Sequence, residues 1–225
     1  MDKTLVSLEN VGRNFSLGGE LVIALADVTC QVKAGDRIAI MGPSGSGKST
    51  LMALMAQLDE PTSGSVTWPG MDTTRGLRPR HIGLAFQSAS LIPSLSVIEN
   101  IEMPLLILGD VQNTKSRALA ALDIVALSGL ADRLPEEISG GQAQRVGIAR
   151  ALVTYPELIL ADEPTGQLDQ ATAKLLVKAL LVHARKTGAA LVIATHDHAV
   201  ACQMKSIWHT EHGRLTTKQK AGVGP

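Results

Sequence analysis

The sequence predicts an α/β protein with a core of strands and helices, a small antiparallel β subdomain and an inserted helical subdomain. Residues 5–11 and 28–32 alternate apolar and polar side chains, which is typical of half-buried strands. From about residue 88 to residue 155, the apolar side chains instead recur every three or four positions, as they do on helices. Strand patterns return at 158–161 and 191–195. These changes of period indicate a helical insertion within a βα core.

The remaining elements lie between these segments. Residues 37–41 are expected to form a short buried strand. A glycine-rich turn follows, and residues 49–58 have the composition of a helix. The segment 61–64 ends that helix at a proline, and strands are expected at 66–68 and 82–86. Further helices are expected at 98–108, 118–127 and 171–185.

The length and composition suit a single domain. Of the 225 residues, 45% are apolar and only 2% aromatic, so the core must be built from aliphatic side chains. Lys and Arg number 21, as do Asp and Glu, so no overall positive field favours nucleic acid. We expect one domain, with the core and β subdomain at about 1–87 and 156–225 and the helical subdomain at about 88–155. The polar tail, 216–225, is expected to fray.

The cysteines and the apolar runs indicate an intracellular chain. Cys30 and Cys202 have no metal-ligand spacing and are too few for a disulfide framework, so we expect two thiols in a reducing compartment. The first residues lack the apolar stretch of a secretory signal. The runs 21–26 and 189–194 are too short to span a bilayer. The chain is therefore expected to be cytoplasmic, held at a membrane only through a partner.

A glycine-rich loop between a strand and a helix forms the first candidate site. Its GxxxxGK[ST] pattern and the residue after it comprise Gly42, Pro43, Ser44, Gly45, Ser46, Gly47, Lys48, Ser49 and Thr50. The glycines let backbone N–H groups face phosphate oxygens, and the helix start adds its partial positive charge. Lys48 is expected to reach the β- and γ-phosphates, and the Ser49 hydroxyl to coordinate Mg²⁺. The alternative is a glycine-rich turn without a ligand. The loop indicates a nucleoside triphosphate but not the class of P-loop protein.

A second candidate element is acidic. The apolar strand 158–161 is followed directly by Asp162 and Glu163. Strands buried on both faces often carry functional side chains at their carboxyl ends. Asp162 can hold Mg²⁺ through its water shell, and Glu163 can polarise a water for attack on the γ-phosphate. The alternative is two solvated acids before the turn at Pro164; the P-loop favours the functional interpretation.

A second glycine-containing helix start lies in the helical insertion. Its residues are Ser139, Gly140, Gly141 and Gln142. They are followed by residues 143–152, with the sequence A-Q-R-V-G-I-A-R-A-L. Bare N–H groups at a helix start can bind an anion, so the chain has a second candidate phosphate site. A chain that binds one nucleotide on its P-loop would need this second site only if it faced the nucleotide of a second copy. The alternative is a capped helix after a glycine turn. Residues 138–152 closely resemble the LSGGQ signature of ABC ATPases. The resemblance implies a P-loop NTPase with a RecA-like core, in which the signature of one subunit closes over the ATP of the other.

Further matches to this family extend over nearly the whole chain. Gln87 corresponds to the Q-loop glutamine. The resemblance implies that this residue is catalytic, that it senses Mg²⁺ and water, and that it lies next to the permease. His196 corresponds to the switch histidine at the γ-phosphate. Asp169 belongs to the D-loop, where Gln167 replaces the usual Asn or Ser. Phe15 corresponds to the aromatic residue that stacks on adenine, with packing in the core as the alternative.

Some segments resemble one branch of the family, the lipoprotein-releasing, macrolide-export and cell-division group. These segments are 58–64, 98–106 and 158–166. The stretch 69–80 is shorter than in most members. Its end carries a basic cluster, interpreted as a solvated loop rather than a partner contact: Arg75, Arg78, Arg80 and His81.

The resemblance as a whole implies an ATPase that uses ATP and Mg²⁺ and forms a homodimer in the ATP-bound state. It would bind an integral-membrane permease, lie on the inner face of the membrane and power export or extraction of a lipoprotein, peptide or hydrophobic compound. No nucleic-acid partner is expected. The alternatives are force transmission without cargo, a soluble ABC ATPase acting on nucleic acid or ribosomes, and an importer subunit.

Overall fold

The computed structural model describes residues 3–219. They divide into two compact units, one formed by the residues up to 77 together with those from 192 onward, the other by 78–191. The α/β fold class is confirmed, whereas the subdomain limits given above stay a prediction.

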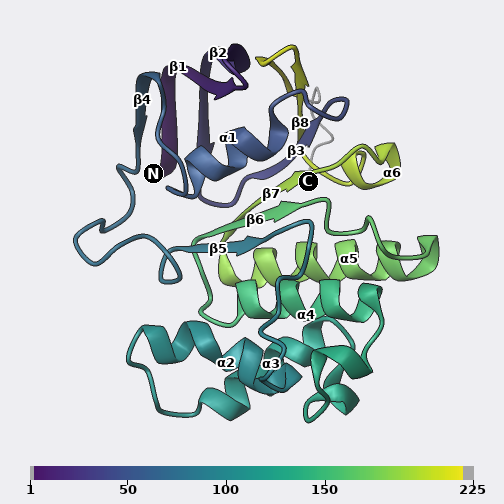
Figure 1. The fold of residues 1–225 in the computed structure, drawn as a ribbon. Helices are drawn as coiled ribbons and strands as arrows, with labels where there is room; N and C mark the ends of the chain where they lie inside the picture. The colour runs from purple at the N-terminus through teal and green to yellow at the C-terminus, as the bar shows by residue number, and fades with distance from the viewer. Residues whose placement is uncertain (1–2, 220–225) are drawn as a thin grey trace. The chain divides into compact units, whose positions relative to one another are not determined.

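The first unit contains a three-stranded antiparallel sheet in the order β2-β1-β4 (Figure 1). Its strands are β1 (Thr4–Leu17), β2 (Glu20–Lys33) and β4 (Ser63–Thr67). Strands β1 and β2 meet in a two-residue turn at Gly18 and Gly19, which both have positive φ. Glycine adopts that backbone without steric cost, and such turns match the twist of a hairpin. The alternating segments predicted at 5–11 and 28–32 lie within these longer strands.

The same unit contains the strand that leads into the glycine-rich loop. Strand β3 (Arg37–Met41) is buried at every position, including Arg37, as the sequence predicts, and it pairs in parallel with β8 (Ser206–Glu211). Helix α1 (Lys48–Met55) follows the loop and is shorter than the helix predicted at 49–58. The short helix α6 (His198–Ala201) follows β7 (Ala190–Ala194), the strand that crosses the boundary between the two units in sequence.

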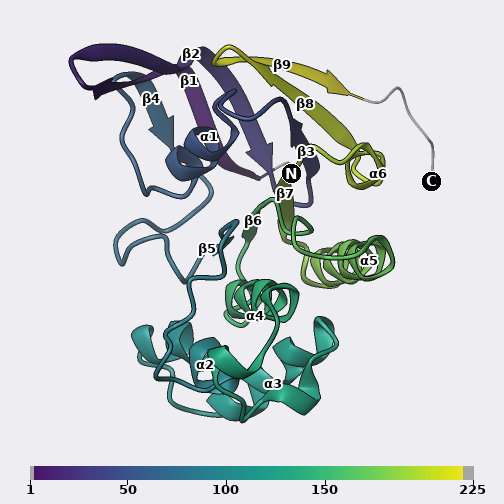
Figure 2. The ribbon, with the colours of Figure 1, turned by 45° about the vertical axis from the view of Figure 1, so that its right-hand side comes forward.

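The hairpin of β8 and β9 (Arg214–Gln219) corrects the expectation that the chain frays from residue 216 (Figure 2). His212 and Gly213 form its turn, both with positive φ. Pairing with β8 satisfies the backbone of this polar segment, so the strand continues as far as Gln219. Residues 220–225 of the predicted tail lie outside the described residues.

The second unit pairs β5 (Ile82–Ala85) with β6 (Leu158–Asp162) in parallel, in register from Ile82 with Leu158 to Ala85 with Ala161. Its helices are α2 (Val97–Ile107), α3 (Thr114–Ile124), α4 (Gly140–Leu152) and α5 (Gln170–Thr187), with 3₁₀ turns η1 (Ser128–Leu130) and η2 (Pro135–Glu137). Helix α4 packs against α2, α3 and β5. Gly83 permits the close approach to β5, because a Cβ there would lie 2.0 Å from the Ala151 carbonyl oxygen.

Among the residues that the structure describes, no helix is both long and apolar enough to cross a membrane.

Candidate functional site

The glycine-rich loop is built to receive an anion. Helix α1 begins after Gly47, whose φ is 101°, and the helix start has neither a side-chain cap nor an acidic residue in its first turn. The first helical hydrogen bond joins the Leu51 N–H to the Gly47 carbonyl at 2.9 Å, so the amides of Lys48 and Ser49 precede it. Lys48 is mostly buried, and its Nζ donates to the Gly42 and Pro43 carbonyls at 2.8 and 3.0 Å. A cation inside a loop with open amides fits a phosphate.

Two glycines of the loop are required by close backbone approach. A Cβ on Gly47 would lie 2.5 Å from the Ala24 carbonyl oxygen, and one on Gly42 would lie 2.2 Å from the Thr210 carbonyl oxygen. The buried Ser46 hydroxyl lies 2.8 Å from the Thr210 hydroxyl, which also donates to the Met41 carbonyl at 3.2 Å. Thr210 therefore fixes the loop to β8. Sequence reasoning missed this residue because no motif contains it.

The other loop residues differ in exposure. Pro43, Ser44, Gly45 and Ser49 are exposed, whereas Gly42 and Thr50 are half-buried. The exposed Ser49 hydroxyl is thus accessible to a ligand, as its predicted role requires.

Phe15 lies half-buried in the first unit and is covered by an arginine. The Arg13 guanidinium lies 4.6 Å from the ring centroid. Two bonds to Asp59 hold this guanidinium, Nε to Oδ2 at 2.8 Å and Nη2 to Oδ1 at 2.7 Å. Phe15 pairs with Val22 of β2, two residues before the Ala24 that contacts Gly47. The ring predicted to stack on adenine is therefore placed by the same strand that contacts the phosphate loop.

His196 follows β7 in the first unit. The Thr195 N–H donates to the Ile40 carbonyl at 3.0 Å, so His196 follows a strand whose end is bonded to the end of β3. His196 is exposed, and the next residue, Asp197, caps α6 by accepting from the Ala199 N–H at 2.7 Å. The phosphate loop and His196 thus follow neighbouring strand ends.

The second unit holds the predicted acidic residues and Gln87. Asp162 is half-buried at the end of β6, and the largely buried Glu163 follows with φ 46°. This left-handed backbone is uncommon for a residue with a side chain and is typical of functional sites. Gln87 lies exposed just after β5. Because β5 and β6 are parallel and Ala85 pairs with Ala161, these residues follow the same edge of the strand pair.

The predicted second helix start is present at α4, but the hydroxyl of its serine already accepts a hydrogen bond from its own helix. Ser139 and Gln142 form a capping box: the Gln142 N–H donates to the Ser139 hydroxyl at 3.3 Å, and the Ser139 N–H donates to the Gln142 Oε1 at 2.8 Å. The amides of Gly140 and Gly141 precede the first helical hydrogen bond, from Ala143 to Ser139. The helix start therefore offers glycine amides, with the Ser139 hydroxyl turned to its own helix.

The loop after Glu163 packs against this helix start. A Cβ on Gly140 would lie 2.6 Å from the Gln167 Oε1, and one on Gly141 would lie 2.9 Å from the Gln167 carbonyl oxygen. Gln144, which the sequence did not single out, donates from Nε2 to the Glu163 carbonyl at 2.8 Å and accepts from the Gln167 N–H at 3.1 Å. The predicted signature and the acidic loop are thus in direct contact within one unit.

Asp169 has a structural role in this arrangement. Its carboxylate caps α5, accepting from the N–H groups of Ala171 and Thr172, both at 3.0 Å, and from the Thr172 hydroxyl at 2.6 Å. These hydrogen bonds, the Thr172 hydroxyl first, lower the pKa of Asp169. The nucleotide contact assigned to Asp169 stays a prediction.

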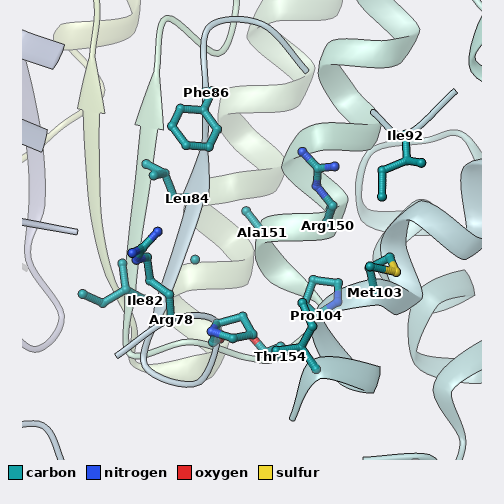
Figure 3. Close-up of a pocket in the computed structure, with 13 residues that line it drawn as sticks. Arg78, Ile82, Leu84, Phe86, Ile92, Met103, Pro104, Arg150, Ala151 and Thr154 are labelled. Atoms are coloured by element: carbon teal, nitrogen blue, oxygen red, sulfur yellow. The ribbon is translucent and has the colours of Figure 1, made fainter. Parts of the chain in front are cut away.

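An apolar cavity of about 300 Å³ lies in the second unit, lined mainly by residues of β5, α2 and α4 (Figure 3). Figure 3 shows Phe86 after β5, Met103 and Pro104 on α2, and the Arg150 side chain drawn between Phe86 and Ile92. Arg150 donates to the Ala89 and Ser90 carbonyls at 2.7 and 3.1 Å, and burial lowers its pKa.

Members of the basic cluster interpreted as a solvated loop differ from one another. Arg75, Arg78 and Arg80 are exposed, as expected, although Arg78 also lines the cavity. His81 is half-buried, with its Nδ1 2.9 Å from the Glu157 Oε1, so it is not part of a solvated surface.

A phosphate loop, a pair of carboxylates at the end of a buried strand and a glycine-containing helix start are the motifs of the nucleotide-binding cassette class of ATPases. Residues 25–166 match the sequence model of the family described as ABC transporter, and the chain belongs to this family.

Within this family, the chain is similar to transporter proteins of two kinds. The chain is 40% identical over 222 residues to the lipoprotein-releasing system ATP-binding protein LolD of Pseudomonas syringae pv. tomato, a match that covers 95% of this chain and 98% of that protein. It is 42% identical over 223 residues to the macrolide export ATP-binding/permease protein MacB of Burkholderia pseudomallei. That match covers 96% of this chain but 34% of the relative, so the chain spans about a third of its length.

A solved structure is similar along almost the whole chain. The ATP-binding cassette MJ0796, described as a dimer in a post-hydrolysis state bound to ADP and Pi, matches with a TM-score of 0.89 and 36% identity, over 97% of this chain and all of the other. This neighbour confirms the cassette fold.

Proposed function

We propose that two copies of this chain bind two MgATP molecules between them, hydrolyse them and so drive a membrane permease. One observation carries the proposal: the chain has two helix starts suited to anions, at Gly47–Ser49 and at Ser139–Gly141, but only the first has a lysine within its loop. The second would then serve the nucleotide of a facing copy. The dimeric state described for MJ0796 supports this arrangement.

The residue roles follow from the chemistry of each group. Lys48 and the loop amides would hold the phosphates, and Phe15 would stack on the base. Glu163 would accept a proton from the attacking water, and His196 would contact the γ-phosphate. Gln87 would orient that water, while Gly140 and Gly141 of the facing copy would complete the charge stabilisation.

The oxygen donors present fit Mg²⁺. The Ser49 hydroxyl is exposed, and the Asp162 carboxylate lies at a strand end in the same segment as Glu163. Mg²⁺ prefers hard oxygen ligands and few protein contacts. Ser49, Asp162 and Gln87 would hold it, and when bound it would neutralise charge on the phosphate oxygens.

The apolar cavity in the second unit is where a permease would dock. Phe86, Ile92 and Ile107 are exposed around it, and the Arg150 guanidinium lies among them. Exposed apolar side chains gathered at a cavity indicate a contact surface. The names of the LolD and MacB relatives support an exporting permease for lipoproteins, peptides or hydrophobic compounds, which would place this chain on the cytoplasmic face of a membrane.

Mixed dimers test the sandwich. Glu163→Gln should abolish turnover while ATP binding remains, measured by phosphate release and equilibrium titration. Introducing Ser139→Arg into one subunit should then inactivate the site whose P-loop belongs to the other subunit. To measure the site at the P-loop of the Ser139→Arg subunit alone, Glu163→Gln is placed in the other subunit. To measure the opposite site alone, Glu163→Gln is placed in the Ser139→Arg subunit itself. Loss confined to the mutant's own P-loop site would rule out the facing arrangement.

A further inference from the structure

A buried glutamine joins the start of α4 to the backbone of Glu163. Gln144 is only 2% exposed, and both polar atoms of its side-chain amide are hydrogen-bonded. Its Nε2 donates to the Glu163 carbonyl at 2.8 Å, and its Oε1 accepts from the Gln167 N–H at 3.1 Å. A buried amide is costly unless its hydrogen bonds are made, and here each bond goes to main chain of the loop after β6. The position of Gln144 is therefore fixed relative to that loop.

The bond to Glu163 acts at a strained point of the chain. With φ 46°, Glu163 occupies a backbone region that side-chain-bearing residues rarely adopt, and such conformations persist only where the surroundings hold them. The Glu163 carbonyl also accepts from the Gly166 N–H at 3.1 Å, within a tight turn. Gln144 supplies the contact to this carbonyl from another element, so it helps to fix the direction in which the Glu163 carboxylate leaves the backbone.

Gln144 also lies one turn from the glycine-containing helix start. Gly140 and Gly141 contact Gln167 so closely that a Cβ on either would overlap its atoms. Residues four apart lie on the same face of a helix, which places Gln144 above Gly140 on the face that meets the 163–169 loop. The helix start, Gln144 and Glu163 thus form one contiguous contact.

We infer that Gln144 is a positioning residue that couples the position of the α4 start to the backbone conformation of Glu163. This inference rests on the proposed function, in which the facing copy's triphosphate binds that start. A displacement of α4 on phosphate binding would be carried by the Gln144 amide to the Glu163 carbonyl. Occupancy of the facing site would thereby reach this chain's own catalytic carboxylate.

Two substitutions separate hydrogen bonding from packing. Gln144→Met keeps the length and volume of the side chain but removes both hydrogen bonds, and Gln144→Glu keeps the shape but replaces the donor with an acceptor. Small misplacement of a reacting group can cost about 100-fold in rate, so kcat should fall about 10- to 100-fold in both. The ATP dissociation constant should stay within about 2-fold of wild type, because neither bond touches the P-loop. Gln203→Met, which alters an exposed glutamine bonded to the Ala199 carbonyl, is the matched control.

Mixed dimers assign the effect to one site. In the first dimer, Gln144→Met is in one subunit and Glu163→Gln is in the other, so the only active glutamate belongs to the Gln144 variant. In the second, both substitutions share a subunit, and the active glutamate belongs to the unaltered copy. The inference predicts loss of turnover in the first dimer and activity near that of a Glu163→Gln mixed dimer in the second.

Each other outcome has a separate meaning. Loss in the second dimer alone would show that Gln144 acts on the partner's nucleotide, and would overturn the inference. Normal kcat in Gln144→Met, with Glu163→Gln inactive, would overturn it while leaving the proposed function intact. Normal hydrolysis by Glu163→Gln would instead overturn the proposed role of Glu163. Unfolding of Gln144→Met, detected by lost ATP binding, leaves Gln144→Glu to decide by the same mixed-dimer comparison.

Discussion

Replacing Gly47 by alanine should disable the phosphate loop with little effect on the rest of the fold. Gly47 has φ 101°, and a Cβ would lie 2.5 Å from the Ala24 carbonyl oxygen and 2.8 Å from the Leu25 Cδ2. Backbone strain of this kind costs about 1–3 kcal/mol, and forcing an extra methyl into a packed site costs about 1–3 kcal/mol more. The loop must therefore move away from β2 to accommodate the methyl group.

The lower ends of the two ranges together give about 2 kcal/mol, which corresponds to about 30-fold in a dissociation constant. We therefore expect Gly47→Ala to weaken ATP binding at least about 30-fold in equilibrium titration. Gly188→Ala is the matched control, because Gly188 also has positive φ, at 74°, but has open space around its Cβ position. That control should lose about 1 kcal/mol in urea unfolding and bind ATP as the wild type does. Unchanged ATP affinity in Gly47→Ala would refute the close-packed loop.

Three further substitutions test other parts of the site. Lys48→Ala should remove nucleotide binding in equilibrium titration, since its ammonium lies within the phosphate loop; unchanged affinity would exclude it from the site. Arg13→Ala should weaken ATP binding by about 2- to 5-fold, the value of a cation–π contact, but leave the affinity for ribose triphosphate unchanged. An equal loss for both ligands would show that Arg13 does not act through the Phe15 ring. Phe86→Asp should abolish co-purification of the permease, with ATP titration as the folding check; retained co-purification would place the permease elsewhere.

The local elements could be predicted where composition and period are strong. The buried run at 37–41 matches β3 residue for residue, and the two predicted carboxylates lie at the end of β6, with Asp162 as its last residue and Glu163 directly after it. The sequence does not reveal the hairpin of β8 and β9, because its strands lack a sustained apolar pattern and its turn is His-Gly rather than the familiar Asn-Gly.

Residues that support the site could not be predicted from spacing. Thr210 lies 164 positions from Ser46, whose hydroxyl it contacts, and no local pattern links them. Gln144 is part of a helix that the sequence predicts, but its period does not reveal that the amide reaches the Glu163 carbonyl. Such contacts depend on which faces of distant segments meet, and a single sequence does not encode that directly.

The cap of α4 bears on how readily two copies can separate. The bond from the Gln142 N–H to the Ser139 hydroxyl is long, at 3.3 Å, and therefore weak. A helix whose first turn is satisfied by its own serine stays wound in a lone chain, yet gives up little when that hydroxyl rotates toward an incoming phosphate. In the proposed dimer, α4 would therefore stay wound each time the two copies separate, and we expect product release without local unfolding of this helix.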